Sequence, residues 1–172
     1  MTGFTFENDR PLRKVVSGGQ IGADIAGLRA GRRIGLETGG FIPAGFRTKV
    51  GNIPELGEQY GLVETMSPSY PRRTWLNAES ATATIRLAIN FDSPGENLTL
   101  KYCKELNKPV HDIQLARLHT EDDKIKAINE LVNFIRLHQV EILNVAGNGL
   151  REIEKLVEEI LFETFKHVKI VV

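Results

Sequence analysis

The sequence is poor in cysteine, with the single residue Cys103 in 172 positions. One thiol excludes an internal disulfide framework and a cysteine-based zinc cluster. The four histidines, at positions 111, 119, 138 and 167, show no spacing typical of metal ligands. We therefore predict no metal centre and interpret Cys103 as a small buried hydrophobic side chain. A soft metal ligand is the alternative interpretation, and no second ligand supports it.

The chain also lacks long hydrophobic runs and a net charge. No stretch approaches the roughly 18 consecutive apolar residues of a membrane helix. Residues 1–13 lack the cationic start and apolar centre of a signal peptide. Lysine plus arginine and aspartate plus glutamate both total 22, so no overall positive field favours nucleic acid. We expect a cytoplasmic protein that binds neither membranes nor nucleic acid.

Short apolar runs alternate with helical patterns along the chain. The expected strands are residues 14–17, 36–42, 62–65, 83–90, 110–113 and 141–146, with a final strand or tail at 168–172. The expected helices are residues 22–33, 73–79, 97–106, 120–138 and 150–165, and the segment 43–60, rich in glycine and proline, is expected to be a long loop.

Strands joined by such helices pair in parallel through right-handed crossovers. The pattern predicts an α/β fold, a Rossmann-like three-layer sandwich with a mostly parallel sheet. Residues 14–172 are expected to form a single ligand-binding domain that follows an N-terminal tail at 1–13. In such sheets, ligands bind beyond the carboxyl ends of the strands.

The most distinctive motif follows the first expected strand, where an apolar run breaks into glycines and reopens as a helix. Its glycine and polar residues are Ser17, Gly18, Gly19, Gln20, Gly22 and Asp24. Such a junction points unpaired backbone N–H groups at one place, near the positive end of the helix dipole. We interpret the motif as a cradle for a phosphate or another small anion.

Asp24 allows two interpretations. In the first turn of a helix it can merely compensate the helix dipole, for about 0.3–1 kcal/mol. Alternatively, its carboxylate accepts hydrogen bonds from the N–H groups of a heterocycle. The position of Gln20 inside the turn favours contact with a ligand over packing.

Two further strands end in glycine-containing turns, at residues 90–95 and 145–149. In a parallel sheet all three turns lie at one edge, and glycine permits close approach of a ligand there. The candidate residues in these turns are Ser93, Pro94, Gly95 and Gly147. The first turn lacks the Gly-x-Gly-x-x-Gly fingerprint of dinucleotide sites, and no Walker loop is present.

A basic helix supplies a second group of candidates, Arg73, Thr74 and Asn77. Arg73 and Asn77 are four residues apart and therefore share one helix face. A guanidinium beside an anion makes charge-assisted bonds of roughly 1.5–3 kcal/mol each. A solvated basic turn is the alternative. Weaker candidates of the same kind are Arg47, Lys49 and Arg151.

Together, these motifs resemble one family, the proteins classed as molybdenum cofactor carriers, in their circularly permuted branch. The motifs that carry the resemblance are residues 17–24, 38–40 with 43–45, 73–74 with Asn77, 93–95 with 98–99, and 144–147. The branch belongs to a Rossmann-like superfamily that includes the Lonely-Guy nucleotide phosphoribohydrolases. The resemblance spans about residues 15–165. The turn after Val145 looks like the first turn of unpermuted relatives, displaced to the C-terminus.

The resemblance implies a homo-oligomeric protein that stores the molybdenum cofactor, a phosphate-bearing pterin, or hands it to molybdoenzymes without turnover. The implied binding residues are Ser17, Gly18, Gly19, Gln20, Gly22, Asp24, Thr38, Gly39, Gly40, Arg73, Thr74, Asn77, Ser93, Pro94, Gly95, Thr99 and Gly147. Ile21, Ile25, Ala81 and Glu96 depart from the family pattern, and a carboxylate at Glu96 repels phosphate. The alternative cargo is a nucleotide or phosphate.

An enzymatic function is a further alternative, because the phosphoribohydrolase relatives cleave N-glycosidic bonds. They use a glutamate three residues after a Gly-Thr pair, where this chain has Thr99, which cannot exchange a proton near neutral pH. A hydrolase acting on nucleoside monophosphates would need another acid/base, such as Glu96 or Asp92.

Overall fold

The structure, a computed structural model, describes residues 9–172. Its strands are β1 (Lys14–Val16), β2 (Glu37–Ile42), β3 (Arg47–Thr48), β4 (Gly51–Asn52), β5 (Leu62–Glu64), β6 (Ala83–Ala88), β7 (Val110–Gln114) and β8 (Ile142–Gly147). Its α-helices are α1 (Ala23–Ile34), α2 (Glu55–Tyr60), α3 (Tyr70–Ser80), α4 (Pro94–Glu105), α5 (Glu121–Leu137) and α6 (Glu154–Lys166). Short 3₁₀ turns lie at Leu115–Arg117 and Arg151–Ile153.

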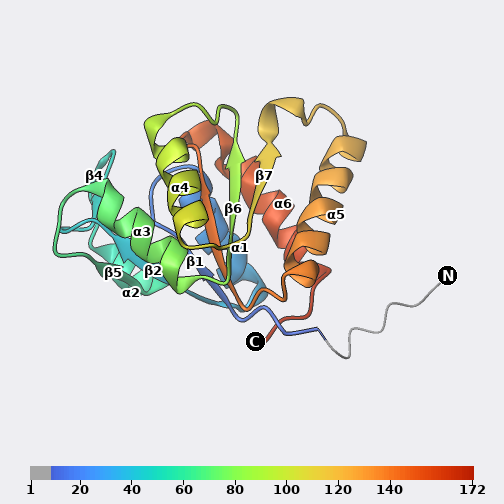
Figure 1. The fold of residues 1–172 in the computed structure, drawn as a ribbon, viewed down its shortest axis with the longest axis horizontal. Coiled ribbons are helices and arrows are strands. Elements are labelled where there is room, and N and C mark those ends of the chain that lie inside the picture. Colours follow the sequence, from blue (N-terminus) through green and yellow to red (C-terminus); the bar gives the residue numbers. More distant parts are fainter. Residues whose placement is uncertain (1–8) are drawn as a thin grey trace.

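Six strands form one sheet in the order β5-β2-β1-β8-β6-β7, and every pairing in it is parallel. Figure 1 shows α3 and α4 in front of this sheet, with α1 and α6 behind it. Helix α5 packs beside α6 and next to β7, while α2 packs beside β5. The predicted three-layer α/β fold with a parallel sheet is therefore confirmed.

The core follows from the central strands, which are apolar and covered on both faces. All six residues of β6 are buried, and Val15, Ile85 and Leu143 are fully inaccessible. A smaller apolar cluster joins α1 to α2 through Leu28 and Leu56. Continuous burial is what parallel strands between two helical layers require.

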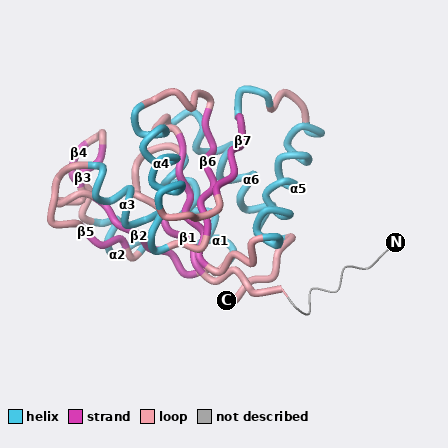
Figure 2. Tube along the Cα trace, in the orientation of Figure 1, coloured by secondary structure: helices cyan, strands magenta, loops and turns pink. Residues whose placement is uncertain are grey.

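The segment 43–60 differs from the predicted long loop. It contains the antiparallel pair β3 and β4 and the helix α2, as Figure 2 shows. Leu56 is buried, and the partly buried Phe46, Ile53 and Tyr60 pack against its cluster. These tertiary contacts order a segment whose composition alone favours irregular structure.

Two helices begin earlier than predicted, because proline occupies their first turns. Helix α3 starts at Tyr70, three residues before the expected start, and carries Pro71 in its first turn. Helix α4 starts at Pro94, and the Ser93 side chain caps it by accepting a hydrogen bond from the Glu96 N–H at 3.3 Å. Proline is favoured at this position because its missing N–H has no helical partner there.

The two ends of the described chain lie together (Figure 1). Leu12 is fully buried, and its N–H donates to the Lys169 carbonyl at 2.8 Å. Leu12 and Ile170 form an isolated parallel bridge, which is the extent of strand structure at the predicted final strand. Residues 1–8 of the predicted tail lie outside the described residues, whereas Leu12 packs with the domain. None of the helices within residues 9–172 is long and apolar enough to span a bilayer.

Candidate ligand-binding site

A cavity of about 610 Å³ lies at the carboxyl ends of the central strands. It is bounded by the turns after β1, β6 and β8, by the first turns of α3 and α4, and by the segment between β3 and β4. Beyond β1 the chain moves toward β2, whereas beyond β6 it moves toward β7 on the other side of the sheet. The strand-end cavity thus occupies the topological switch point, where doubly wound sheets bind ligands.

Roughly half of the predicted binding residues line the strand-end cavity. They are Gln20, Asp24, Arg73, Thr74, Ser93, Pro94, Gly95, Thr99 and Gly147. The other predicted residues lie outside its lining, namely Ser17, Gly18, Gly19, Gly22, Thr38, Gly39, Gly40 and Asn77. The structure therefore divides the predicted set into a lining and a supporting scaffold.

Four backbone donors of the first turn are bonded within the protein, while the N–H groups of Gly18 and Ile21 have no acceptor among residues 9–172. The Gly19 N–H donates to Ser17 Oγ at 3.2 Å, and the Gln20 N–H donates to Asp24 Oδ2 at 3.3 Å. The Gly22 N–H donates to Glu154 Oε1 at 3.0 Å, and Ala23 donates to a carbonyl of the β8 turn at 3.1 Å. Internal oxygens thus occupy four N–H groups of the expected anion cradle.

The glycines of this turn allow backbones and side chains to approach closely. A Cβ on Gly18 would overlap the guanidinium of Arg73, and a Cβ on Gly22 would overlap the Asn148 carbonyl. Gly22 also has a φ of 92°, in the left-handed region. The need for glycine here comes from packing of the turn against α3 and the β8 turn.

Asp24 projects from the first turn of α1 and is 5% exposed. Its Oδ2 accepts from the Gln20 N–H and from Arg73 Nη1, the latter at 3.2 Å. Burial raises the pKa of Asp24, while the charges of Arg73 and Lys49 act in the opposite direction. Both hydrogen bonds use Oδ2, which leaves Oδ1 without a hydrogen bond among residues 9–172.

Glu96 is a second buried carboxyl group in the same cavity, again 5% exposed. Its Oε2 has no hydrogen-bond partner among residues 9–172, and it lies 3.6 Å from Arg86 Nη1. Burial raises the pKa of Glu96 to about 7, although the Arg86 guanidinium lowers it. The nearby carboxylates of Asp24 and Asp112 raise it further.

Arg86 fixes the start of α4 against the sheet. This buried side chain on β6 donates from Nε to Asp112 Oδ1 on β7 at 2.8 Å, and from Nη2 to Asp112 Oδ2. Its Nη1 donates to the Glu96 carbonyl oxygen at 2.8 Å. The bidentate pair with Asp112 fixes the guanidinium in place. The guanidinium in turn holds the backbone of Glu96 at the cavity.

Two other lining residues carry buried polar atoms without partners. Gln20 donates from Nε2 to the Arg47 carbonyl at 3.0 Å, while its Oε1 accepts nothing among the described residues. Arg73 Nε likewise lacks an acceptor within residues 9–172, although its guanidinium lies 5.4 Å from the centre of the Tyr70 ring. Buried polar atoms are normally bonded, so these atoms indicate a place for ligand or water.

Asn77 supports the fold from α3. Its Oδ1 accepts from the Phe41 N–H at 2.8 Å, and its Nδ2 donates to the Phe41 carbonyl at 2.9 Å. Strand β1 ends at Val16, opposite Gly39, so the side chain of Asn77 continues the ladder where the strand stops. Arg73 reaches the cavity, whereas Arg72 beside it is exposed and Arg151 lies outside the lining.

The turns after β6 and β8 also carry backbone donors without an acceptor. Among residues 9–172, the N–H groups of Gly95, Gly149 and Leu150 have no recorded acceptor. Asn148 ties the two turns together, since its Oδ1 accepts from Ile89 and Asn90 and its Nδ2 donates to the Asn90 carbonyl. All three free donors belong to residues that line the cavity.

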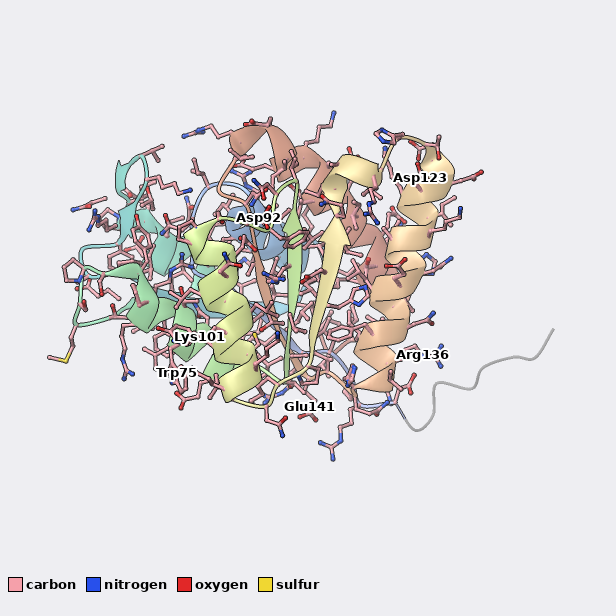
Figure 3. The ribbon with its side chains drawn as sticks, turned by 45° about the horizontal axis from the view of Figure 1, so that its top comes forward. Trp75, Asp92, Lys101, Asp123, Arg136 and Glu141 are labelled. Carbon is pink, nitrogen blue, oxygen red and sulfur yellow. The ribbon has the colours of Figure 1, made fainter. Side chains whose placement is uncertain are left out.

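Sequence reasoning did not assign ten lining residues to binding. They are Lys49, Tyr70, Pro71, Asn90, Glu96, Leu98, Ala146, Asn148, Gly149 and Leu150. Most of them flank the predicted motifs in sequence, and this proximity is the feature of the sequence that could have indicated them. Lys49 was a weaker candidate, and Glu96 stood out only as a departure from a family pattern. Asp92, the alternative acid/base, is exposed and lies outside the cavity lining, in the loop before α4 (Figure 3).

Cys103 is fully buried on α4, away from the cavity lining, as expected for a small hydrophobic side chain. Burial also raises the pKa of its thiol. Within residues 9–172, no three histidine, cysteine, aspartate or glutamate side chains gather in a geometry suited to a metal ion.

Comparison with known proteins gives a family and a fold. The crystal structure of a protein from Syntrophus aciditrophicus, named "Putative molybdenum carrier protein", superposes with a TM-score of 0.78 at 24% sequence identity. The match covers 95% of this chain and 98% of the other. No curated protein matches the sequence. The model of the circularly permutated YpsA SLOG family matches residues 15–165, and the chain therefore belongs to that family.

Proposed function

We propose that this protein is a binding protein that holds the molybdenum cofactor, a phosphate-bearing pterin, in its strand-end cavity and hands it to a molybdoenzyme. The observation that carries the proposal is the composition of one cavity. Buried carboxyl groups lie there beside the cationic side chains of Arg73 and Lys49 and the free N–H groups of Gly95, Gly149 and Leu150. The name of the Syntrophus protein supports the choice of cargo.

The two chemical halves of the cargo correspond to two kinds of lining group. A pterin ring presents N–H donors, which a carboxylate such as that of Asp24 accepts. A phosphate accepts hydrogen bonds, which free backbone N–H groups and a guanidinium donate. The carboxyl groups and the free donors come from different turns, so each half of the cargo has its own partners.

The size of the cavity and the number of available bonds suit such a ligand. A volume of about 610 Å³ lies within the range of small-molecule sites. Micromolar affinity requires about 8 kcal/mol after the costs of association. Three to five charge-assisted bonds and a stacked ring supply this, whereas one turn alone does not.

The proposal is tested by cofactor content and cofactor protection. Protein produced in a cofactor-synthesising host is expected to retain pterin, detected by fluorescence after oxidation, and to slow the decay of added cofactor. Arg73→Gln removes the cavity guanidinium and is expected to reduce both readouts at least tenfold. Arg72→Gln is the matched control because Arg72 is exposed on the same helix. Absence of pterin together with unchanged cofactor decay would refute the carrier function.

A second candidate function is hydrolysis of the N-glycosidic bond of a nucleoside monophosphate. The observation that favours it is the buried carboxyl group of Glu96, whose pKa is raised to about 7. A general acid is most effective when its pKa lies near the working pH. Thr99 does not take this part, because its hydroxyl donates to the Gly95 carbonyl at 3.0 Å.

The hydrolase is distinguished from the carrier by base release from a panel of nucleoside monophosphates. An enzyme would release free base, and Glu96→Gln would abolish the release while the protein remains folded. Asp92→Asn is the control, since Asp92 lies outside the cavity lining. Tight binding of a nucleotide without turnover would instead identify a nucleotide-binding protein.

A further inference from the structure

We propose that the strand-end cavity recognises its ligand chiefly by the N–H donor edge of a heterocycle, which Asp24 and Glu96 accept together. The group recognised is a ring amide N–H next to an exocyclic amino group, as in 2-amino-4-oxo pyrimidine rings. This inference rests on the proposed binding function and specifies which part of the ligand is selected. It differs from the expectation, based on the sequence motif, of an anion held by the first glycine-rich turn.

Residues that line the cavity carry a surplus of hydrogen-bond acceptors. Glu96 Oε2 and Gln20 Oε1 are buried and accept no hydrogen bond among residues 9–172, and the solvent-accessible Asp24 Oδ1 also has no donor. Each of the three side chains is at least nine-tenths buried. A buried acceptor without a donor costs about 1–3 kcal/mol, and a ligand that brings several N–H groups removes this cost.

Charged side chains from four elements surround Glu96. Helix α1 contributes Asp24, α3 contributes Arg73, β6 contributes Arg86 and β7 contributes Asp112 to its electrostatic surroundings. Arg86 is already paired with Asp112, and Arg73 with Asp24. Both guanidinium groups are thus partly neutralised by carboxylates, Arg86 Nη1 also lies 3.6 Å from Glu96 Oε2, and an anion placed at Glu96 meets a further carboxyl group. An uncharged ring with N–H donors meets no such repulsion.

Binding of a donor edge has a consequence for protons. With a pKa of about 7, Glu96 carries a proton in a substantial fraction of molecules at neutral pH. Donors from a ligand stabilise the carboxylate, lower this pKa and release the proton. An anion bound at the same place raises the pKa and takes up a proton. The sign of the proton exchange thus separates the two modes of recognition.

The experiment compares pterin with lumazine, which has a carbonyl oxygen in place of the 2-amino group. Affinity is measured by titration calorimetry at pH 7 in buffers of different ionisation enthalpy, which also yields the protons exchanged. We expect pterin to bind at least tenfold more tightly than lumazine and to release protons. Glu96→Gln is expected to weaken pterin binding at least tenfold and to abolish proton release. Glu105→Gln, an exposed carboxyl on the same helix, is the matched control.

Several results would overturn the inference. These are equal affinity for pterin and lumazine, no binding of pterin, unchanged pterin binding by Glu96→Gln, or displacement of pterin by inorganic phosphate with proton uptake. If Glu96→Gln does not fold, Asp24→Asn takes its place with the same expected loss. Pterin binding without cofactor retention would contradict the carrier function alone. Cofactor retention with equal affinity for pterin and lumazine would contradict this inference alone.

Discussion

Two glycine-containing regions at one edge of the sheet differ in what their backbone donors do. In the first turn, internal oxygens accept the N–H groups of Gly19, Gln20 and Gly22, and only those of Gly18 and Ile21 have no acceptor among residues 9–172. In the turns after β6 and β8, the N–H groups of Gly95 and Gly149 have no acceptor among residues 9–172. Backbone donors that are already bonded within a glycine-rich strand–helix junction are not available to a ligand.

Gly22 and Gly95 also differ in the space around them, whereas a Cβ on Gly147 in the β8 turn would overlap the Leu87 carbonyl. A Cβ on Gly22 would overlap the backbone of the β8 turn, whereas a Cβ on Gly95 would meet no atom within 4 Å. Glycine at position 22 is therefore required by internal packing. At position 95 it leaves space toward the cavity. The predictions below test this contrast, beginning with the largest expected effect.

Replacing Gly22 with alanine is expected to destabilise the fold by about 3 kcal/mol or more. The residue has a φ of 92°, and the added Cβ would overlap the Asn148 carbonyl and lie 2.6 Å from the Leu150 nitrogen. Urea unfolding followed by circular dichroism measures the loss. A change below 1 kcal/mol would show that the turn is not tightly packed against β8.

The raised pKa of Glu96 predicts that the stability of the fold depends on pH. Its pKa is raised from 4.5 to about 7 by burial, so the folded state holds this proton more tightly than the unfolded state does. Stability contributed by the protonated form is therefore lost as the pH rises through 7. Between pH 5 and pH 8, the unfolding free energy of the unaltered protein should fall by about 2.5 kcal/mol more than that of Glu96→Gln. Unfolding free energies of both proteins at the two pH values measure this difference.

The control for this pH effect is Glu105→Gln, because Glu105 is an exposed carboxyl at the other end of α4. Its pH dependence should equal that of the unaltered protein. If Glu96→Gln and the unaltered protein show parallel pH profiles, the Glu96 carboxyl is not buried in the manner described. The pair thus tests the electrostatics of the cavity without any ligand.

Asn77→Ala should destabilise the fold by about 2–3 kcal/mol, because both polar groups of Phe41 lose their partner in a partly buried place. The folded variant should bind pterin with unchanged affinity, since Asn77 lies outside the cavity lining. Chemical unfolding and pterin titration together measure the two properties. A loss of affinity without a loss of stability would return Asn77 to the binding residues.

Much of the fold was predictable because it depends on local patterns. The apolar periodicity of α5 and its Thr120–Asp123 capping box are legible within a few residues, and the structure contains both. The two-residue strands β3 and β4 were not predictable, because strands this short have no periodicity. They depend on tertiary contacts such as that of Phe46 with the α2 cluster.

The location of the site was predictable, but the hydrogen-bond partners of its residues were less so. Three turns at the ends of parallel strands implied one shared place, and the structure brings residues of all three to one cavity. The acceptors that occupy the first turn include Glu154, which is remote in sequence. No local spacing reveals such a partner, or the pairing of Asn77 with Phe41. Long-range hydrogen bonds therefore decided which predicted residues support and which line the cavity.

A smaller effect is expected from Asn148→Ala, which removes the hydrogen bonds that link the turn after β6 to the turn after β8. Three hydrogen bonds to residues 89 and 90 are lost, but water can replace them in this partly exposed place. We expect a destabilisation of about 1 kcal/mol, measured by urea unfolding. We also expect weaker pterin binding, because Asn148 holds the β6 turn beside the β8 turn. Unchanged binding would mean that the two turns keep their positions without this side chain.

The smallest effect on stability, and the sharpest test of the contrast, is expected from Gly95→Ala. The residue lies in the first turn of α4 without a positive φ, and its added Cβ meets no atom within 4 Å. Alanine should therefore stabilise the fold by about 0.4–1 kcal/mol. Because Gly95 lines the cavity, the added methyl group takes up space there, and affinity for a phosphate-bearing pterin should fall. Gly22→Ala and Gly95→Ala thus change stability in opposite directions, and a destabilised Gly95→Ala would remove the distinction between the two regions.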